Sequence, residues 1–180
     1  MNLDANRSGQ AYALTVITPI APGAAGELRG YLDGLRAGPS PLARLPRTHF
    51  GRWVIVPDFI AEDEREPDHL SAPHLLFTAC FDGTVESYLA ELGTELAAEA
   101  DQIWGRCAGC PRPATGAALA DYLMAHRIKT GFFVAAYGKA TVPEVRAALA
   151  QREALIAFAQ EAQKMDDATR QREFLARFGS

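Results

Sequence analysis

Two segments of the sequence place polar and ionisable side chains at alternating positions, as strands would present them. The first is Thr48 to Pro57 (THFGRWVIVP), and the second is His74 to Phe81 (HLLFTACF), followed by Asp82. The first segment divides into His49, Gly51, Trp53 and Ile55 on one face, and Phe50, Arg52, Val54 and Val56 on the other. The second divides into His74, Leu76, Thr78, Cys80 and Asp82 on one face, and Leu75, Phe77, Ala79 and Phe81 on the other.

This alternation predicts a sheet with one dry face and one open face. The wholly apolar set of the second segment is the natural surface for covering helices, which leaves His74, Thr78, Cys80 and Asp82 on the open face. If the two strands pair, we expect His49 and Trp53 to join them. Such a mixed surface suits the wall of a small-molecule pocket. The alternatives are a subunit interface and a partly solvated face.

Within this wall, His49 is the first candidate for catalysis, because imidazole transfers protons near neutral pH and also binds metals. The alternative is a histidine at the start of a strand that bonds to a turn. Arg52 lies within an otherwise apolar strand, where it could bind the carboxylate of a substrate. Its long side chain could equally reach past the edge of the sheet.

Residues 79–83 (ACFDG) resemble the GxxDG signature of dye-decolourising haem peroxidases, with alanine in place of the first glycine. Those enzymes are larger and contain two ferredoxin-like modules. The resemblance implies haem as a candidate cofactor, Asp82 as the distal acid, and His126 as the candidate axial ligand. The alternative is that Asp82-Gly83 before Thr84 is an ordinary turn leading into a helix.

A CxxC motif at Cys107 to Cys110 suggests either a redox pair or half of a zinc site. A redox pair of the thioredoxin type follows a strand and opens a helix, whereas this motif closes a helix. A zinc site needs two further ligands at recognisable spacing. The sequence contains no GxSxG, P-loop, GxGxxG or HExxH motif, so the common hydrolase and nucleotide-binding functions lack support.

The surrounding pattern predicts an α+β fold. Further strands are expected at Tyr12–Ile20, which is rich in β-branched residues, and at Gly131–Tyr137 (GFFVAAY). Apolar residues at helical spacing predict helices near 28–35, 85–104, 119–126 and 143–164. Thr84 is the expected cap of the second helix, and Thr141 with Glu144 forms a capping box before the last. The acidic segment Asp58–Pro73 is expected to be a solvated loop.

The resulting order, β-α-β-β-α-(α)-β-α, resembles the ferredoxin-like folds of the dimeric α/β-barrel superfamily over about residues 11–160. The resemblance rests on element order. It implies an antiparallel sheet with helices on one face, extra helices after the fourth strand, a homodimer with facing sheets, and a small ligand or haem between sheet and helices. We expect a flexible N-terminus at 1–10, the α+β domain at 11–163, and a helical C-terminal tail at 164–180.

Composition limits the remaining possibilities. The 180 residues are 48% hydrophobic and 22% charged, in the range of ordinary globular domains, and the formal net charge is −4. No cluster of Lys and Arg indicates a nucleic-acid surface, and no apolar run is long enough to cross a membrane. The polar first ten residues lack the apolar centre of a signal peptide, and three cysteines fit a reducing compartment, so a cytoplasmic protein is expected.

Three functions therefore remain. The first is a small-molecule binder or enzyme of the dimeric α/β-barrel type, with a monooxygenase-like reaction implied by the resemblance. The second is a haem-dependent, peroxidase-like oxidoreductase. The third is a non-enzymatic protein that binds partners through the open face or through the apolar residues of the tail, which are Phe174, Leu175 and Phe178. The sequence leaves the substrate and the cofactor open.

Overall fold

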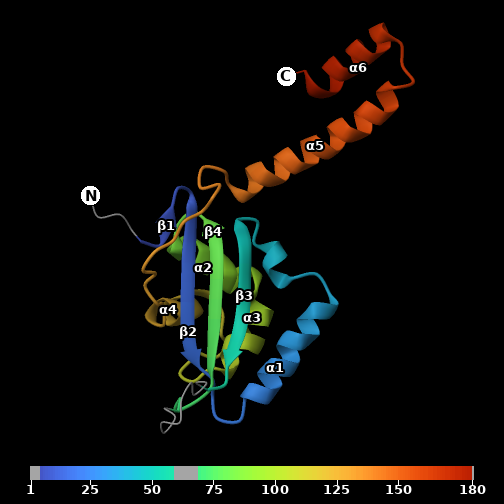
Figure 1. Cartoon of the computed structure of the whole chain (residues 1–180). Helices are drawn as coiled ribbons and strands as arrows, with labels where there is room; N and C mark the ends of the chain where they lie inside the picture. Colours follow the sequence, from blue (N-terminus) through green and yellow to red (C-terminus); the bar gives the residue numbers. More distant parts are fainter. Residues whose placement is uncertain (1–4, 59–68, 180) are drawn as a thin grey trace, which may run out of the picture. The chain divides into compact units, whose positions relative to one another are not determined.

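The computed structural model describes residues 5–58 and 69–179 (Figure 1). The chain divides into two compact units, Met1–Val142 and Pro143–Ser180. This division falls earlier than the expected end of the α+β domain at residue 163. Most of the predicted acidic loop, residues 59–68, lies outside the described residues, as do residues 1–4 and 180.

The first unit is built on a four-stranded antiparallel sheet. Its strands are β1 (Arg7–Ser8), β2 (Ala11–Pro19), β3 (Thr48–Val56) and β4 (His74–Asp82), in the order β1-β2-β4-β3. Figure 1 shows the long strand β4 between β2 and β3. The predicted α+β class and three of the predicted strands are therefore confirmed.

The expected fourth strand at Gly131–Tyr137 is not a strand. The free edge of β2 is instead shared by β1 and by a single bridge between Val16 and Arg127. Beyond that bridge the chain leaves the ladder, and the amide of Ala135 binds the hydroxyl of Ser8 at 3.0 Å rather than a strand carbonyl. Part of the N-terminus expected to be flexible is thus in the sheet, and the complete ferredoxin-like strand order is not observed.

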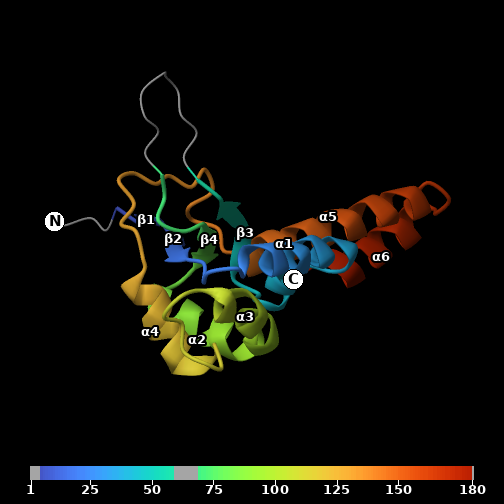
Figure 2. The same cartoon turned by 90° about the horizontal axis from the view of Figure 1, so that it is seen from below.

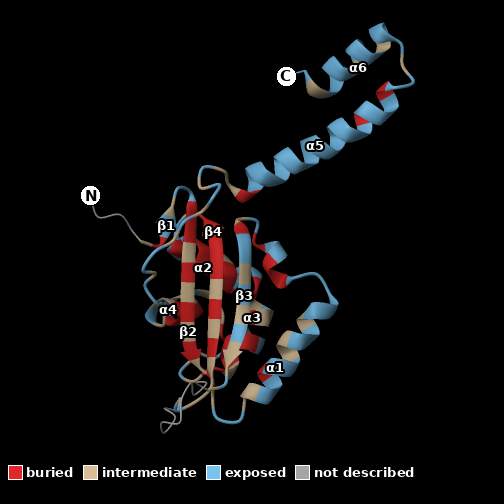
Figure 3. Cartoon of the chain, in the orientation of Figure 1, coloured by how far each residue is buried: buried red, intermediate tan, exposed pale blue. Residues whose placement is uncertain are grey.

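Helices α2 (Val85–Glu95), α3 (Ala97–Ile103) and α4 (Gly116–Ala125) cover one face of the sheet (Figure 2). Helix α1 (Ala25–Gly34) contacts α3 and β3. The 3₁₀ turns η1 (Leu35–Ala37), η2 (Pro41–Arg44) and η3 (Trp104–Arg106) lie in the connections. The predicted dry face is confirmed, because four residues of β4 are each at most 1% exposed, namely Leu75, Phe77, Ala79 and Phe81. Figure 3 shows this core as alternating buried positions along β2 and β4.

The helix expected to run continuously from Val85 to Trp104 is broken at Leu96 into α2 and α3. Thr84 caps α2 as predicted, since its side chain accepts a hydrogen bond from the amide of Ser87. At Leu96 the backbone turns to φ −111° and ψ 26°, outside the helical range. Two residues earlier, the hydroxyl of Thr94 bonds to the carbonyl of Ala90, a contact that bends helices.

The second unit is a helical hairpin of α5 (Val142–Ala162) and α6 (Asp167–Phe178). The side chain of Asp166 caps α6 by accepting a hydrogen bond from the amide of Thr169. The two helices meet at three phenylalanine rings, with centroids 5.3 to 5.8 Å apart: Phe158, Phe174 and Phe178. In the part of the chain that the structure describes, no helix combines the length and the apolar character needed to span a membrane.

Candidate functional site

A β-bulge brings His49 and Asp82 together. Thr48 pairs with Phe81 and Phe50 pairs with Cys80, so His49 is an extra residue with no partner in the ladder. A bulge re-aims the side chain of the inserted residue. The imidazole Nε2 of His49 lies 2.9 Å from Oδ1 of Asp82. The structure thus brings the two predicted site residues into contact, and their role in a functional site stays a prediction.

The carboxylate of Asp82 is buried, and each of its two oxygens has a hydrogen-bond partner. Its side chain is 8% exposed, against 26% for His49. While Oδ1 contacts His49, Oδ2 accepts a hydrogen bond of 2.7 Å from the amide of Val142, the first residue of α5. A buried carboxylate with both oxygens bonded is held in one orientation, and it in turn fixes the imidazole.

His49, but not Asp82, borders an apolar cavity of about 370 Å³, which we call the His49 cavity. It is lined by His49, Phe50, Cys80 and residues 133–137. Such a volume accommodates a small organic molecule, and cavities of this kind are mostly apolar with a few polar groups that orient the ligand. Here the imidazole is the polar group that can exchange a proton.

One wall of the His49 cavity is the segment 130–138, which we call the strap. The N-terminal residues anchor it at both ends. The side-chain Nδ2 of Asn6 donates to the hydroxyl of Thr130 at 2.8 Å, and the backbone amide of Gln10 donates to the carbonyl of Gly138 at 2.6 Å. Gly9, with φ +63°, lies so close to Gly138 that a Cβ would stand 1.9 Å from its carbonyl oxygen. Only glycine fits this contact.

Sequence reasoning missed the strap and the turn that anchors it. The dipeptide Ser8-Gly9 is a recognised turn signal and, between Arg7 and Gln10, could have indicated the hairpin of β1 and β2. The role of Phe50 was also missed. Its side chain is 66% exposed and contributes to the wall of the His49 cavity.

A second hollow of about 370 Å³ adjoins the first, which we call the Arg52 hollow. The two share Phe50 and Cys80. Arg52 and Thr78 face each other across the ladder of β3 and β4, and Nε of Arg52 lies 3.3 Å from the hydroxyl of Thr78. The expected positions of Thr78 and Cys80 on the open face are confirmed, and Arg52 joins them there although the sequence predicted it for the opposite face.

The thiol of Cys80 has little nucleophilic character in this position. Cys80 is 9% exposed, and burial raises the pKa of its thiol above the ordinary value, because a thiolate would lose its hydration there. The neutral thiol therefore contributes an apolar, polarisable surface to both hollows.

The expected position of Trp53 on the open face is wrong. Trp53 pairs with Phe77 in the ladder and stacks on its ring, with centroids 5.3 Å apart, on the helix-covered face. Trp104 meets it edge-on at 6.1 Å. The large apolar ring gains more from this core than from the open face. The bulge explains how His49 and Trp53, four positions apart, come to lie on opposite faces.

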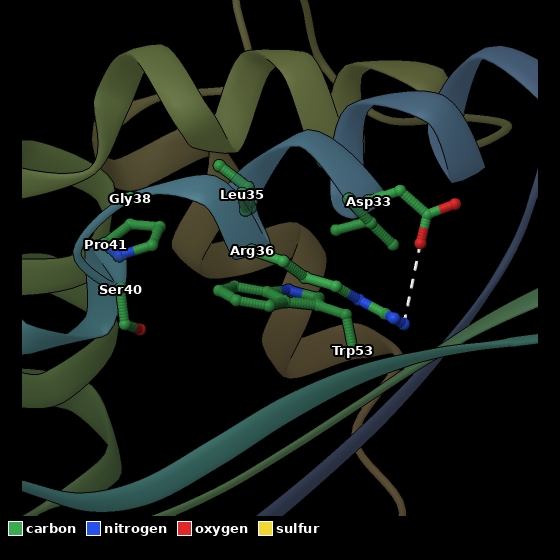
Figure 4. Close-up of a pocket in the computed structure, with 8 residues that line it drawn as sticks. Asp33, Leu35, Arg36, Gly38, Ser40, Pro41 and Trp53 are labelled. Atoms are coloured by element: carbon green, nitrogen blue, oxygen red, sulfur yellow. Dashed lines mark ion pairs between the residues drawn. The ribbon is translucent and has the colours of Figure 1, made fainter.

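On that helix-covered side Trp53 borders a separate cavity of about 350 Å³. Figure 4 shows it between Trp53, the end of α1 and the turns η1 and η2, with Arg36 beside Asp33 at 3.5 Å. The indole Nε1 of Trp53 is buried, with no hydrogen-bond partner among the described residues. The cavity is on the other side of the sheet from His49.

His74 is on the open face but remote from the His49–Asp82 pair. It begins β4, which Asp82 ends, and eight positions along a strand span roughly 26 Å. Its Nδ1 is buried and lacks a partner in the described part of the chain. The expected single wall is thus divided between the two ends of the strand.

A haem held between Asp82 and His126 does not fit the arrangement. Asp82 lies opposite Ala11 in β2, whereas the carbonyl of His126 binds the amide of Ile17. These positions are six residues apart, roughly 20 Å along one strand. Nδ1 of His126 also lies 2.8 Å from the carbonyl of Tyr122. The two predicted haem residues cannot reach one iron together.

The CxxC motif shows no sign of an activated thiol. Burial raises the pKa of Cys107, and burial followed by the neighbouring Cys107 raises the pKa of Cys110 to about 12. An active redox cysteine requires the opposite shift. Across residues 5–58 and 69–179, no group of three or more His, Cys, Asp or Glu side chains is arranged to hold a metal ion.

Comparison of the chain with protein families, with curated proteins and with solved structures finds no match. The case for a function therefore depends on the geometry of the site.

Proposed function

We propose that the protein binds a small, largely apolar organic molecule in the His49 cavity and exchanges a proton with it through His49. The observation that carries this proposal is that His49, bonded to Asp82, lies at the wall of an apolar cavity. An imidazole held by a buried carboxylate is a common arrangement for general acid–base catalysis.

The hydrogen bonds assign a role to each atom of the pair. An ionised carboxylate only accepts hydrogen bonds, so Nε2 of His49 carries the hydrogen that faces Asp82. Nδ1 then holds the lone pair that can accept a proton from a ligand. Asp82 is the positioning residue, and His49 is the acid–base group. Removal of a proton from a phenol or an enol by Nδ1 would leave His49 as the imidazolium and the ligand as an electron-rich anion.

We further propose a ferredoxin-like homodimer with facing sheets. Three strands, β2, β4 and β3, have the neighbours expected in that fold, and the open face carries exposed apolar side chains, Phe50 at 66% and Val54 at 38%. A second copy over this face would remove that surface from water. The three cysteines are free thiols, which supports residence in a reducing compartment.

The strap supports a second candidate, a non-enzymatic protein that binds a partner through exposed apolar side chains. Three strap residues are largely exposed, namely Phe132 at 84%, Val134 at 67% and Tyr137 at 83%, and of these only Phe132 lies outside the lining of the His49 cavity. Light scattering of the protein with Phe132→Ser, a strap residue outside the cavity lining, tests whether the strap holds an assembly. Loss of the assembly with unchanged ligand binding would assign the strap to partner contact rather than to the site.

Fluorescence titration with 2-naphthol tests the leading proposal, because this probe combines an apolar ring system with an acidic hydroxyl. We expect binding to the folded protein, loss of binding in Ala135→Trp, which fills the cavity, and weaker binding in His49→Gln. His69→Gln is the matched control, because His69 also contacts an aspartate, Asp58, at 2.8 Å, but is 68% exposed and outside the cavity. Absence of binding to the wild-type protein, or equal effects of the two histidine variants, would refute the proposal.

A further inference from the structure

Among the described residues Arg52 has no acidic partner; Arg7 and Arg127 near the sheet also lack one, but they donate to the carbonyl of Gly83 and to the hydroxyl of Tyr12. Arg44, Arg47 and Arg106 each pair with a glutamate, at 2.5, 2.6 and 3.6 Å. Arg52 is exposed on the open face, and within the described residues no carboxylate lies in ion-pair distance of it. Its strand neighbours on that face, Phe50 and Val54, are apolar.

The single contact of Arg52 leaves its binding edge free. Nε lies 3.3 Å from the hydroxyl of Thr78, which holds the side chain over β4. The two terminal nitrogens of the guanidinium then remain available, and together they match a carboxylate with two parallel hydrogen bonds. Thr78 acts here as a positioning residue for an anion-binding group.

The distance between the two hollows limits the size of the ligand. His49 and Arg52 are three residues apart in β3, but because His49 is an inserted residue they are separated by two to three ladder positions, roughly 7 to 10 Å along the strand. The hollows meet at Phe50 and Cys80, whose apolar surfaces lie between the two polar groups. A flat molecule of about two fused rings spans this length.

We propose that the ligand of this site is a flat aromatic carboxylate whose hydroxyl reaches His49 and whose carboxylate binds Arg52. This inference rests on the proposed function, because it takes the His49 cavity as the site of the hydroxyl. It adds the Arg52 hollow as an anion subsite, so the two hollows form one elongated binding surface on the open face of the sheet.

Three related probes test the inference by fluorescence titration: 2-naphthol, 2-naphthoate and 6-hydroxy-2-naphthoate. For the wild-type protein we expect 6-hydroxy-2-naphthoate to bind roughly fivefold more tightly than 2-naphthol, the gain of one exposed, hydrogen-bonded ion pair. Arg52→Gln should abolish this gain without changing the affinity for 2-naphthol, and Arg52→Lys should keep part of it. His49→Gln should weaken the two hydroxylated probes and spare 2-naphthoate.

Two controls separate this inference from the proposed function. Arg36→Gln removes an exposed arginine on the other side of the sheet and should leave all three affinities unchanged, and unaltered binding of 2-naphthol by Arg52→Gln shows that the variant is folded. If 2-naphthol binds but the carboxylate brings no gain, or if the gain survives in Arg52→Gln, the anion subsite is refuted and the proposed function stands. If 2-naphthol does not bind the wild-type protein, both the proposed function and the anion subsite are refuted.

Discussion

Replacing Asp82 by alanine should destabilise the first unit strongly, because the carboxylate serves two elements at once. The amide of Val142 would remain buried without an acceptor, which costs about 1 to 3 kcal/mol. The bond to the partly exposed His49 contributes about 0.5 to 1.5 kcal/mol more. We therefore expect Asp82→Ala to lower the free energy of unfolding by about 2 to 4 kcal/mol.

Two variants divide this loss between the two bonds. Asp82→Asn keeps a carbonyl oxygen for the amide of Val142, so it should retain most of the stability, with a loss of about 1 kcal/mol. His49→Ala keeps the whole carboxylate and removes only the bond to a side chain that is 26% exposed, so its loss should be of about the same size.

Urea denaturation measures these free energies, and hydrogen exchange at the Val142 amide reports the single bond directly. Exchange at Val142 should be fast in Asp82→Ala and remain slow in both Asp82→Asn and His49→Ala. An equal loss for Asp82→Ala and Asp82→Asn would contradict the reasoning. So would an Asp82→Ala variant whose Val142 amide stays protected.

Three more perturbations test other parts of the structure. Gly9→Ala should lower the free energy of unfolding by about 1 to 3 kcal/mol and abolish 2-naphthol binding, since its Cβ would displace Gly138 and the strap. Gly23→Ala, also at positive φ but with nothing within 4 Å, should cost about 1 kcal/mol and leave binding intact. Thermal melts and fluorescence titration check both variants. Trp53→Ala should cost about 2 to 4 kcal/mol and Phe50→Ala less than about 0.5 kcal/mol in urea denaturation, and the reverse order would place Trp53 on the open face. Burial raises the pKa of Cys110 from its ordinary value of 9.0 to about 12 in the folded protein. Between pH 9.0 and about pH 12 the thiol therefore loses its proton in the unfolded chain but keeps it in the folded protein. The free energy of unfolding should fall as the pH rises through this range. Urea denaturation at about pH 8 and about pH 10.5 should show a smaller fall in Cys110→Ala, and equal falls would contradict the assignment.

Local patterns predicted the dry face well, because burial there depends on one strand at a time. Leu75, Phe77, Ala79 and Phe81 alternate along β4 with residues of the open face, so only one face of the strand needs covering helices. In the structure the helices cover that apolar face. The cap at Thr84 is likewise a contact between residues three apart. Such features are readable because their cause lies within a few residues of the chain.

The errors share a different origin, which is contact between distant segments. The residues GFFVAAY have high strand propensity, yet β1 and the Val16–Arg127 bridge already occupy the edge of β2. Strand propensity mostly measures how well side chains fit a sheet that is available to them. Here the contacts of Asn6, Ser8 and Gly9 hold the segment as a strap instead.

The residues of the site were predicted only in part, again because some of their positions depend on contacts between distant segments. The sequence placed His49 and Asp82 on the same face, as in the structure. It also placed Trp53 on that face, because it assumed that side chains alternate without interruption along β3. Only the register against β4 reveals the inserted residue, and with it the places of Phe50 and Arg52 on the open face. A one-residue shift of register reverses every later side chain of a strand.

That inserted residue stands outside the ladder that joins β3 to β4. Since Thr48 and Phe50 pair with consecutive residues of β4, deleting His49 outright would join two positions that are already in register. Every other side chain of the strand would keep its face and its neighbours. A variant that lacks His49 is therefore expected to lose this side chain and its bond to Asp82 while the pairing of β3 with β4 is kept.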